Sequence, residues 1–463
     1  MKNNVSPFTI VAITSIATFL SNLSAGIVNV PLPQIVQASH GGDFDLVYVV
    51  ISYLVPYAVV MPVAGKLGDA YGHRRVFLWG LGLYAVTSAF TGYAPNIAGL
   101  VALHTLQGLG GGIILVSIVF ISAQIRERTG LALGTWRAAL LSGTVGGPVV
   151  GGYLSAYWGW PSIFWVTAPI AALVWIWGAF ALEELPRSGE GRFDWVGSLS
   201  FIVAFSALVV ALAASGSAMD TMASGLSKAI GATMGAMALM LYGLFIVGLA
   251  VFWFNQRTEK QPLFDMSLYR IRPFVLGNVG TFLVCVGMFS AMMFVPFELQ
   301  YVAGYSALQA SHVLVPLAIT AIVVGVWGGW LTDRLGAVIP WVIGFTIMVA
   351  AFILLALLGP SISPLALTTI MVIEGAGMAL PLAPTAVSAL THVPEESAGE
   401  AGGLFNFSHN MGRAVSFGVF GAILRLGSAG SYTLTFLIAA AAMVVGALLV
   451  LGLVPRPHIA APA

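Results

Sequence analysis

Residues 65–75 (GKLGDAYGHRR) form a polar, glycine-rich run between two long apolar segments. This pattern predicts a tight loop between two membrane helices, in which Gly68 and Gly72 permit the turn and Asp69 caps a helix or pairs with a base. Arg74 and Arg75 would hold the loop on the cytoplasmic side of the membrane. A weaker copy of the run recurs at residues 329–336 (GWLTDRLG). A loop that recurs in this way indicates an internal repeat, and many transporters are built from repeats.

The composition of the chain indicates a membrane protein. Of its 463 residues, 59% are hydrophobic and 8% are charged, whereas a soluble domain carries about 25% charged residues. A soluble globular protein is thereby excluded, and the net charge of +1 gives no sign of a nucleic-acid partner. Cys285 is the single cysteine, so the chain cannot form an internal disulfide, and we expect no thiolate metal cluster. With no phosphate loop or nucleophile triad standing out either, we expect no enzyme activity, no metal and no cofactor.

Apolar segments make up most of the chain. A helix that crosses the hydrocarbon core needs roughly 20 apolar residues, and breaks rich in Pro, Gly and charge separate fourteen such segments. They lie near 8–36, 46–66, 76–94, 98–122, 131–153, 163–183, 195–214, 229–254, 274–300, 310–331, 338–358, 365–390, 401–424 and 432–454. The first segment is too long for the apolar part of a signal peptide, so we expect a retained helix. The prediction is an all-α polytopic protein with fourteen transmembrane helices.

The distribution of Lys and Arg predicts the orientation. With an even number of helices both termini lie on one side, and placing them in the cytoplasm puts 14 of the 18 Lys and Arg residues in inner loops and tails. Lys228 and Arg425 fall outside, while Arg137 and Arg413 lie within helices. If the count were one helix too high, every later loop would move to the other side of the membrane and the asymmetry would be lost. If the count were two helices too high, so that the chain had twelve, the asymmetry would remain.

Two charged linkers divide the chain. The first runs from Glu183 to Asp194 and the second from Gln256 to Arg272, and the two helices between them have no partner in a two-fold scheme. We therefore predict four parts. They are an N-terminal six-helix bundle (1–183), a linker with two extra helices (184–272), a C-terminal six-helix bundle (273–455) and a cytoplasmic tail (456–463).

The repeat also relates two polar residues inside helices. Gln107 follows Asp69 by 38 positions, and Glu374 follows Asp333 by 41 positions. Each residue is followed by the same Gly-x-Gly pattern, at residues 108–110 and 375–377. This spacing makes the helices that carry Gln107 and Glu374 equivalent in the two halves.

A run of glycines marks the fifth apolar segment. Gly143, Gly147 and Gly151 recur at a four-residue step, so they line one helix face and let a neighbouring backbone approach closely. Pro148 removes a backbone donor and bends the helix. On its own the run is as well explained by a packing seam as by a functional element.

Together these patterns resemble the major facilitator superfamily, and more narrowly its fourteen-helix branch of drug:proton antiporters. The runs 65–75, 106–110 and 143–152 match the family signatures between helices 2 and 3, in helix 4 and in the antiporter helix. Shorter matches lie at 27–33, 193–197 and 300–306. The resemblance implies alternating access of two six-helix halves, with a latch at the inner gate. The expected gating residues are Gly65, Asp69, Gly72, Arg74, Arg75, Asp333, Arg334, Arg413, Gly143, Gly147, Pro148 and Gly151.

Three positions depart from the pattern of that family. His104 stands where the helix 4 signature normally has arginine, and Ser24 stands where the helix 1 signature carries aspartate. The family's arginine and aspartate at these positions are usually linked to proton coupling. Their replacement weakens the expectation of coupling and leaves the expected fold intact. The Trp-Arg-Trp run before helix 6 is also changed, to Trp160-Pro161-Ser162.

Charged groups inside the membrane are costly, about 2.5–3.5 kcal/mol on insertion scales, so the few that occur are candidates for function. Glu374 is our leading candidate for proton coupling, and His104 and Glu298 are further candidates. The alternative is that Glu374 and His104 are neutral groups hydrogen-bonded to neighbouring helices. We also expect that histidine in place of the family's arginine helps to admit cationic substrates. Retained coupled transport in Glu374→Gln, or unchanged cation affinity in His104→Arg, would contradict these expectations.

Further polar residues lie on helices that, by the resemblance, line a central cavity. Candidates for substrate binding are Asn22, Asn29, Gln107, Asn278, Gln300 and Glu374, although a buried amide is more often a hydrogen bond between helices. Arg413 shares one helix face with Asn406, His409 and Asn410, and we expect a structural or gating role for it. Glu374 is one possible partner of Arg413.

The predicted function is export of amphipathic or cationic small molecules in exchange for protons. We expect a monomeric, multi-pass protein of the plasma membrane with both termini in the cytoplasm. Two rival functions remain open. One is a dedicated metabolite or lipid transporter, either coupled or uncoupled, and the missing helix 1 acid favours the uncoupled form. The other is a receptor or scaffold that transports nothing.

Overall fold

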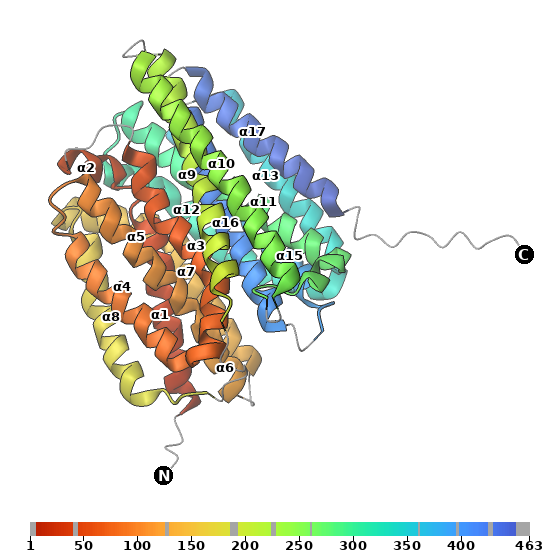
Figure 1. The fold of residues 1–463 in the computed structure, drawn as a ribbon. Coiled ribbons are helices and arrows are strands. Elements are labelled where there is room, and N and C mark those ends of the chain that lie inside the picture. Colours follow the sequence, from red (N-terminus) through yellow and green to blue (C-terminus); the bar gives the residue numbers. More distant parts are fainter. Residues whose placement is uncertain are drawn as a thin grey trace, which may run out of the picture.

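The computed structural model describes residues 6–39, 45–125, 129–185, 193–223, 228–259, 262–359, 362–394, 398–424 and 429–450. In these ranges the regular elements are helices, and the long ones run side by side as a bundle (Figure 1). The helices before residue 185 are α1 (Pro7–Ile27), α2 (Leu32–Ala38), α3 (Asp45–Tyr71), α4 (His73–Thr91), α5 (Ile97–Ile114), α6 (Ile118–Gln124), α7 (Thr129–Trp158) and α8 (Ser162–Ala181).

The remaining helices follow residue 193. They are α9 (Trp195–Ala223), α10 (Lys228–Thr258), α11 (Arg272–Tyr301), α12 (Ala307–Leu335), α13 (Val338–Leu358), α14 (Pro364–Ala379), α15 (Leu382–Leu390), α16 (Ala398–Leu424) and α17 (Ala429–Leu449). Short 3-10 helices at Leu115–Ser117 and Met266–Arg270 lie between α5 and α6 and before α11. Three predicted segments are therefore interrupted, because 8–36, 98–122 and 365–390 each contain two α-helices.

Eleven helices of the described chain are long and apolar enough to cross a membrane. This finding supports the polytopic α-helical fold, while the number fourteen stays a prediction. The long helices outside the eleven are α4, α7 and α16. Two of them carry the polar residues that lower hydropathy, since α4 begins with His73-Arg74-Arg75 and α16 contains Glu400 and Arg413.

The helices pack as two groups that meet along two seams. In the first group α1 packs on α7, and α5 packs on α3 and α4; in the second α11 packs on α16, and α14 packs on α12 and α13. Between the groups, α16 lies against α3 and α7 lies against α12. These two seams would have to loosen and reform if the groups moved relative to each other.

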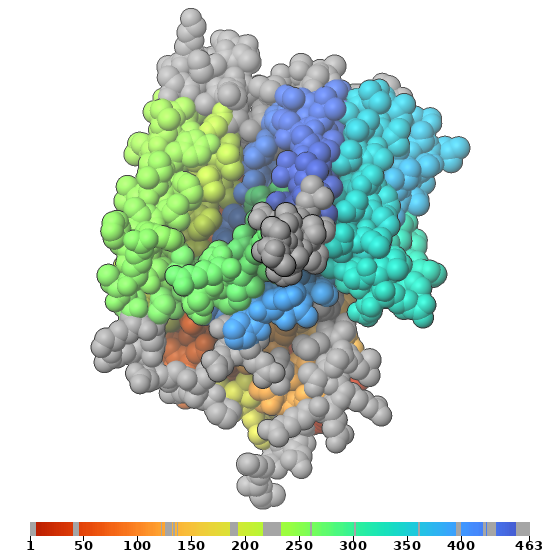
Figure 2. Space-filling model, turned by 90° about the vertical axis from the view of Figure 1, so that its right-hand side faces the viewer, coloured from red at the N-terminus to blue at the C-terminus, as the bar shows by residue number. Residues whose placement is uncertain are grey.

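The helices α9 and α10 form a hairpin on the flank of the bundle (Figure 1). Asp194 accepts hydrogen bonds from the Gly197 backbone N–H at 2.7 Å and from the Asn255 amide at 2.8 Å, which ties the start of α9 to the end of α10. Only α9 packs extensively on the bundle, along α3 and α16. Met240 of α10 is 77% exposed, and the outer face of α10, green in Figure 2, is apolar and suited to lipid.

The stretch 65–75 differs from its predicted loop. The helix α3 continues through Tyr71, the chain turns at Gly72 alone with φ of 103°, and α4 begins at His73. Gly68 lies inside the helix against the His73 ring, so its predicted role in the turn is wrong. The second copy turns in the same way, because α12 ends at Leu335 and Gly336 has φ of 75°.

Glu184 completes the turn at Gly72. Its carboxylate accepts a hydrogen bond from the Arg74 backbone N–H at 2.9 Å, at the start of α4 where backbone donors lack partners within the helix. The Arg74 guanidinium donates to the Ala179 carbonyl at the end of α8. An Asp69 carboxylate oxygen lies 3.4 Å from the His73 Nε2, across the turn at Gly72. These three contacts all lie within the first group of helices.

We expect Gly72→Ala to lower the unfolding temperature of the purified protein. An L-residue in the left-handed region costs about 1–2 kcal/mol, and the new Cβ would lie 2.8 Å from the Glu184 carboxylate. Gly65→Ala is the matched control, because Gly65 is helical with nothing within 4 Å of an added Cβ. Equal unfolding temperatures for the two variants would contradict this role of Gly72.

Candidate functional site

The motifs 107–110 and 374–377 occupy corresponding places in the two groups. A Cβ on the first glycine, Gly108 or Gly375, would meet the backbone of α3 or α12. A Cβ on the second glycine of each motif would meet the backbone of α4 or α13. The glycines thus let α5 and α14 approach two neighbouring helices each, and this packing places Gln107 and Glu374 at equivalent positions.

Glu374 is buried without a hydrogen-bond partner. Its side chain is 0% exposed, and neither carboxylate oxygen has a partner among the residues that the structure describes. Gln107 differs, because its amide donates to the Ser88 hydroxyl of α4 at 2.6 Å. An ionised carboxylate in such a place would be costly, so the neutral acid is the form that suits this site.

Arg413 is the buried cation of α16, and it does not pair with Glu374. Its guanidinium lies over the Phe289 ring, with its central carbon 4.4 Å from the ring centre. One nitrogen is 3.5 Å from the Asn410 amide oxygen, while Nε and Nη2 have no hydrogen-bond partner in the described part of the chain. The pairing with Glu374 that the sequence left open is thus absent from this conformation.

Polar side chains connect α1, α3 and α7 close to Arg413. The Asn22 amide oxygen accepts hydrogen bonds from the Tyr57 hydroxyl at 3.0 Å and from the Thr144 hydroxyl at 3.3 Å. Tyr57 and Tyr53 belong to α3, the helix of the first group that packs against α16, which carries Arg413. The α3 tyrosines were not predicted as site residues, since an aromatic residue in an apolar run carries no distinctive signal.

One further contact crosses the α3–α16 seam. The Asn410 amide lies 3.5 Å from the Met61 sulfur. Beside it on α16, the His409 ring nitrogen is 3.2 Å from the Cys285 sulfur of α11. Asn410 thus contacts α3, whereas His409 and Arg413 contact α11.

His104 is hydrogen-bonded to α3 and fully buried. Its Nδ1 lies 3.0 Å from the Val49 carbonyl and 3.3 Å from the Ser52 hydroxyl, while Nε2 has no partner among the described residues. A carbonyl can only accept, so Nδ1 carries the proton and the ring is suited to the neutral form. No hydrogen bond or ion pair in the described ranges joins His104, Glu298 and Glu374.

The other predicted binding residues form no common hydrogen-bond network in the described part of the chain. The Asn278 amide donates to the Phe274 carbonyl at 2.8 Å within α11, and Gln300 donates to the Val30 carbonyl of the first group at 3.0 Å. Asn29 is 5% exposed, and neither polar atom of its side chain has a partner in the described chain. Glu298 is partly buried near the end of α11. Asn29 is thus the predicted amide with the most unused hydrogen-bonding capacity.

Ser24 occupies a neutral site. Its hydroxyl is hydrogen-bonded to the Tyr84 hydroxyl of α4, and Tyr84 also lies 3.0 Å from the Leu20 carbonyl. The position at which the family signature carries an aspartate is therefore filled by a buried hydroxyl pair. Any carboxylate that carries protons must lie elsewhere in the chain.

The glycines of α7 form a close seam with α1. The seam comprises Gly143, Gly147 and Gly151, and a Cβ on any of them would lie 2.8 Å or less from a carbonyl oxygen of α1. The α1 oxygens belong to residues 19, 23 and 27, so both helices keep the same four-residue step. Pro148 of α7 lies against Gly26 of α1. The packing seam predicted for this run is present in the structure.

Comparison with known proteins decides the family. The family model described as Major Facilitator Superfamily matches residues 14–417. The chain belongs to this superfamily. It is similar to the multidrug resistance protein Stp of Mycobacterium tuberculosis (strain CDC 1551 / Oshkosh), with 33% identity over 425 residues that make up 91% of this chain and 76% of that protein.

Two further comparisons agree with this placement. The multidrug transporter protein MdtP of Bacillus subtilis (strain 168) is 28% identical over 423 residues, which cover 90% of this chain and 75% of that one. The crystal structure of a D-xylose-proton symporter has a TM-score of 0.70 and 13% identity, and the match covers 97% of this chain and 98% of that one. This superfamily member is thus a multi-pass membrane transporter of small molecules and not an enzyme.

Contacts between the two groups occur near both ends of this superfamily member. At one end Tyr153 of α7 is hydrogen-bonded to His312 of α12 at 2.7 Å. At the other end Lys66 of α3 lies 3.6 Å from the Glu400 carboxylate of α16. Sequence reasoning missed Glu400, because it belongs to a polar stretch that looks like an ordinary helix start.

The remaining predicted gating residues make local contacts. The Arg334 guanidinium stacks on the Trp330 ring at 4.4 Å, and both residues belong to α12. Arg75 lies in the first turn of α4. Among the described residues, the ion pair that joins the groups is made by Lys66 and by none of the predicted arginines.

Proposed function

We propose that this chain is a secondary transporter that exports amphipathic or cationic small molecules in exchange for protons. The proposal rests chiefly on Glu374, a fully buried carboxyl group without a hydrogen-bond partner in the described chain. Relatives named as a multidrug resistance protein and a multidrug transporter support the class of substrate.

Glu374 would carry the proton in alternating access. In the present conformation no cation of the described chain pairs with it, and a charge within the membrane costs about 2.5–3.5 kcal/mol on insertion scales. The group would release its proton when substrate or water reaches it in another conformation. Because proton and substrate then favour different conformations, the movement of one would drive the movement of the other. His104 and Glu298 remain further candidates for this pathway.

We propose that substrate binds where the two groups meet. Arg413 retains two unpartnered nitrogens there, within the described structure, which can donate to acceptor atoms of an amphipathic substrate. Tyr57 and Asn22 lie across the seam on α3 and α1. Asn29 adds an unpartnered amide near the end of α1. The other predicted amides, Gln107, Asn278 and Gln300, would contribute only after their present hydrogen bonds break.

The finer organisation of the transporter is also part of the proposal. We propose fourteen spans, with α4, α7 and α16 added to the eleven that are long and apolar enough. The two bundles and the insert would have the predicted boundaries at 183, 272 and 455. Both termini would lie in the cytoplasm, and a monomer in the plasma membrane would be the working unit. The packing of α9 alone on the bundle supports the reading of α9–α10 as an insert.

Transport in proteoliposomes separates this proposal from its rivals. Uptake of a fluorescent organic cation is measured with and without an imposed pH gradient. We expect the pH gradient to drive accumulation of the cation against its own concentration gradient. A transport rate that does not depend on the pH gradient would indicate an uncoupled transporter. The neutral Ser24–Tyr84 pair favours this alternative. No flux of any tested compound would favour a receptor or scaffold.

A further inference from the structure

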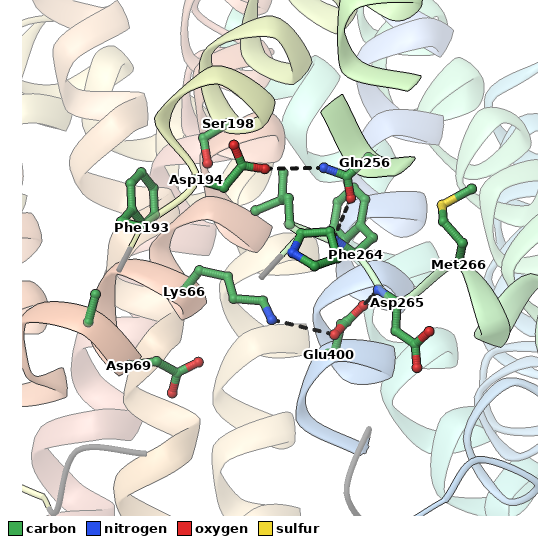
Figure 3. Close-up of a pocket in the computed structure, with 13 residues that line it drawn as sticks. Lys66, Asp69, Phe193, Asp194, Ser198, Gln256, Phe264, Asp265, Met266 and Glu400 are labelled. Carbon is green, nitrogen blue, oxygen red and sulfur yellow. Dashed lines mark hydrogen bonds and ion pairs between the residues drawn. The ribbon is translucent and has the colours of Figure 1, made fainter. Parts of the chain in front are cut away.

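A pocket of about 610 Å³ opens where both groups of helices meet the α9–α10 hairpin (Figure 3). Its volume lies within the roughly 300–1,000 Å³ range of small-molecule sites. Lys66 and Glu400 reach toward each other from α3 and α16, and Asp194 and Gln256 lie on the hairpin side (Figure 3). None of the residues so far proposed for substrate binding lines this pocket, so it is separate from the site at Arg413.

The described lining of the pocket is strongly acidic. It holds four carboxylates, those of Asp69, Asp194, Asp265 and Glu400, and a single ammonium group, that of Lys66. Asp194 accepts hydrogen bonds from amides and a backbone N–H, and Asp265 accepts from the backbone and hydroxyl of Ser267. These neutral donors orient the carboxylates without cancelling their charge.

Glu400 is held in place but incompletely neutralised. One carboxylate oxygen accepts the Asp265 backbone N–H, and the other lies 3.6 Å from the Lys66 nitrogen. Burial raises the pKa of the Glu400 carboxyl, and the Asp265 N–H and Lys66 offset that effect only in part. A second cation beside this carboxylate would therefore be stabilising.

A second feature of the pocket points to a ligand. The Ser198 side chain lines the pocket at 1% exposure, and its hydroxyl has no partner in the described structure. Phe193, Phe264 and Met266 supply apolar surface beside the carboxylates. Acidic groups, an unused hydroxyl and apolar surface together suit a cation with an apolar body.

We propose that this pocket binds organic cations, and that a bound cation competes with Lys66 for Glu400. The proposal deepens the proposed function, since such cations are the substrates proposed above. Occupancy would loosen the charged contact between α3 and α16, so the arrival of substrate would weaken the attachment of the two groups at this end. The hairpin acquires a role as well, because α9 and α10 provide one wall of the pocket.

Local protection from alkylation tests the proposal. Met266→Cys places a thiol in the pocket wall, and the native Cys285 is buried and stays unlabelled. We expect tetraphenylphosphonium to slow the reaction of this thiol with N-ethylmaleimide, and neutral triphenylphosphine oxide to have little effect. The concentration of tetraphenylphosphonium that halves the rate measures its affinity for the pocket.

Two variants then distinguish a cation site from a simple ion pair. Glu400→Gln should raise the half-protecting concentration about tenfold, whereas Lys66→Met should lower it severalfold, as expected for charges at a binding site. Glu183→Gln, at an exposed position outside the pocket, is the control and should change nothing. If the Lys66–Glu400 contact were structural only, both variants would break it and shift protection in the same direction.

The possible outcomes separate this inference from the proposed function. Absent protection, or shifts of the same sign in Glu400→Gln and Lys66→Met, would overturn the cation pocket even if proteoliposomes transport organic cations. Opposite shifts without any transport would establish the pocket and refute the export function instead.

Discussion

Glu374→Gln is expected to abolish accumulation driven by a pH gradient in proteoliposomes. Glutamine keeps nearly the same size but cannot take up or release a proton, so the conformational change would lose its link to the gradient. The buried site should accept the amide, because Gln107 occupies the equivalent position in the first group. Downhill exchange of labelled for unlabelled substrate should continue, since it needs no net proton movement.

The matched control for this variant is Glu183→Gln, which makes the same chemical change at an exposed position after α8. It should behave as the unaltered protein does in both assays. Gradient-driven accumulation that survives in Glu374→Gln would assign coupling to another group, with His104 and Glu298 the next to test. Loss of both activities would instead indicate a damaged binding site.

Gly151→Ala is expected to be the most destabilising glycine-to-alanine change among Gly143, Gly147 and Gly151 of α7. The added Cβ would overlap the Ile27 carbonyl oxygen of α1, which has no free rotation to move aside. Overpacking of this kind costs about 1–3 kcal/mol, and we expect transport to fall because α1 and α7 can no longer pack closely. The unfolding temperature in detergent and the transport rate are the measurements.

Gly146→Ala serves as the control on the same helix. An added Cβ there meets nothing within 4 Å, so this variant should match the unaltered protein or be slightly more stable, because alanine favours the helix. Similar decreases in unfolding temperature and transport rate for Gly146→Ala and Gly151→Ala would contradict the close seam with α1. They would show that the effect comes from helix propensity or membrane insertion.

Features that depend on local pattern could be predicted from the sequence. Apolar runs mark helices because the hydrocarbon core demands them, and each predicted segment contains at least one helix. The turn at Gly72 and the α1–α7 seam follow from the stereochemistry of glycine. The relation of Gln107 to Glu374 followed from counting along the two halves, and the packing of their glycines agrees with it.

Features that depend on long-range packing could not be predicted in this way. Polar residues 65–71 look like a loop in the sequence, yet α3 remains helical as far as Tyr71. The position of Arg413 over the Phe289 ring and the Lys66–Glu400 contact each join distant segments, and no local pattern specifies such partners. Hydropathy alone does not specify the number of spans, because polar residues such as Arg74 and Arg413 lower the hydropathy of the helices that carry them.

Exchange of substrate for a proton at Glu374 is tested most directly by the pH of a weakly buffered solution of the purified protein. Tetraphenylphosphonium is added near neutral pH, and the protons released per bound cation are counted. We expect the unaltered protein to release about one proton more than Glu374→Gln, because binding favours the ionised carboxylate. Equal release by the two proteins, or binding without any release, would contradict proton exchange at Glu374.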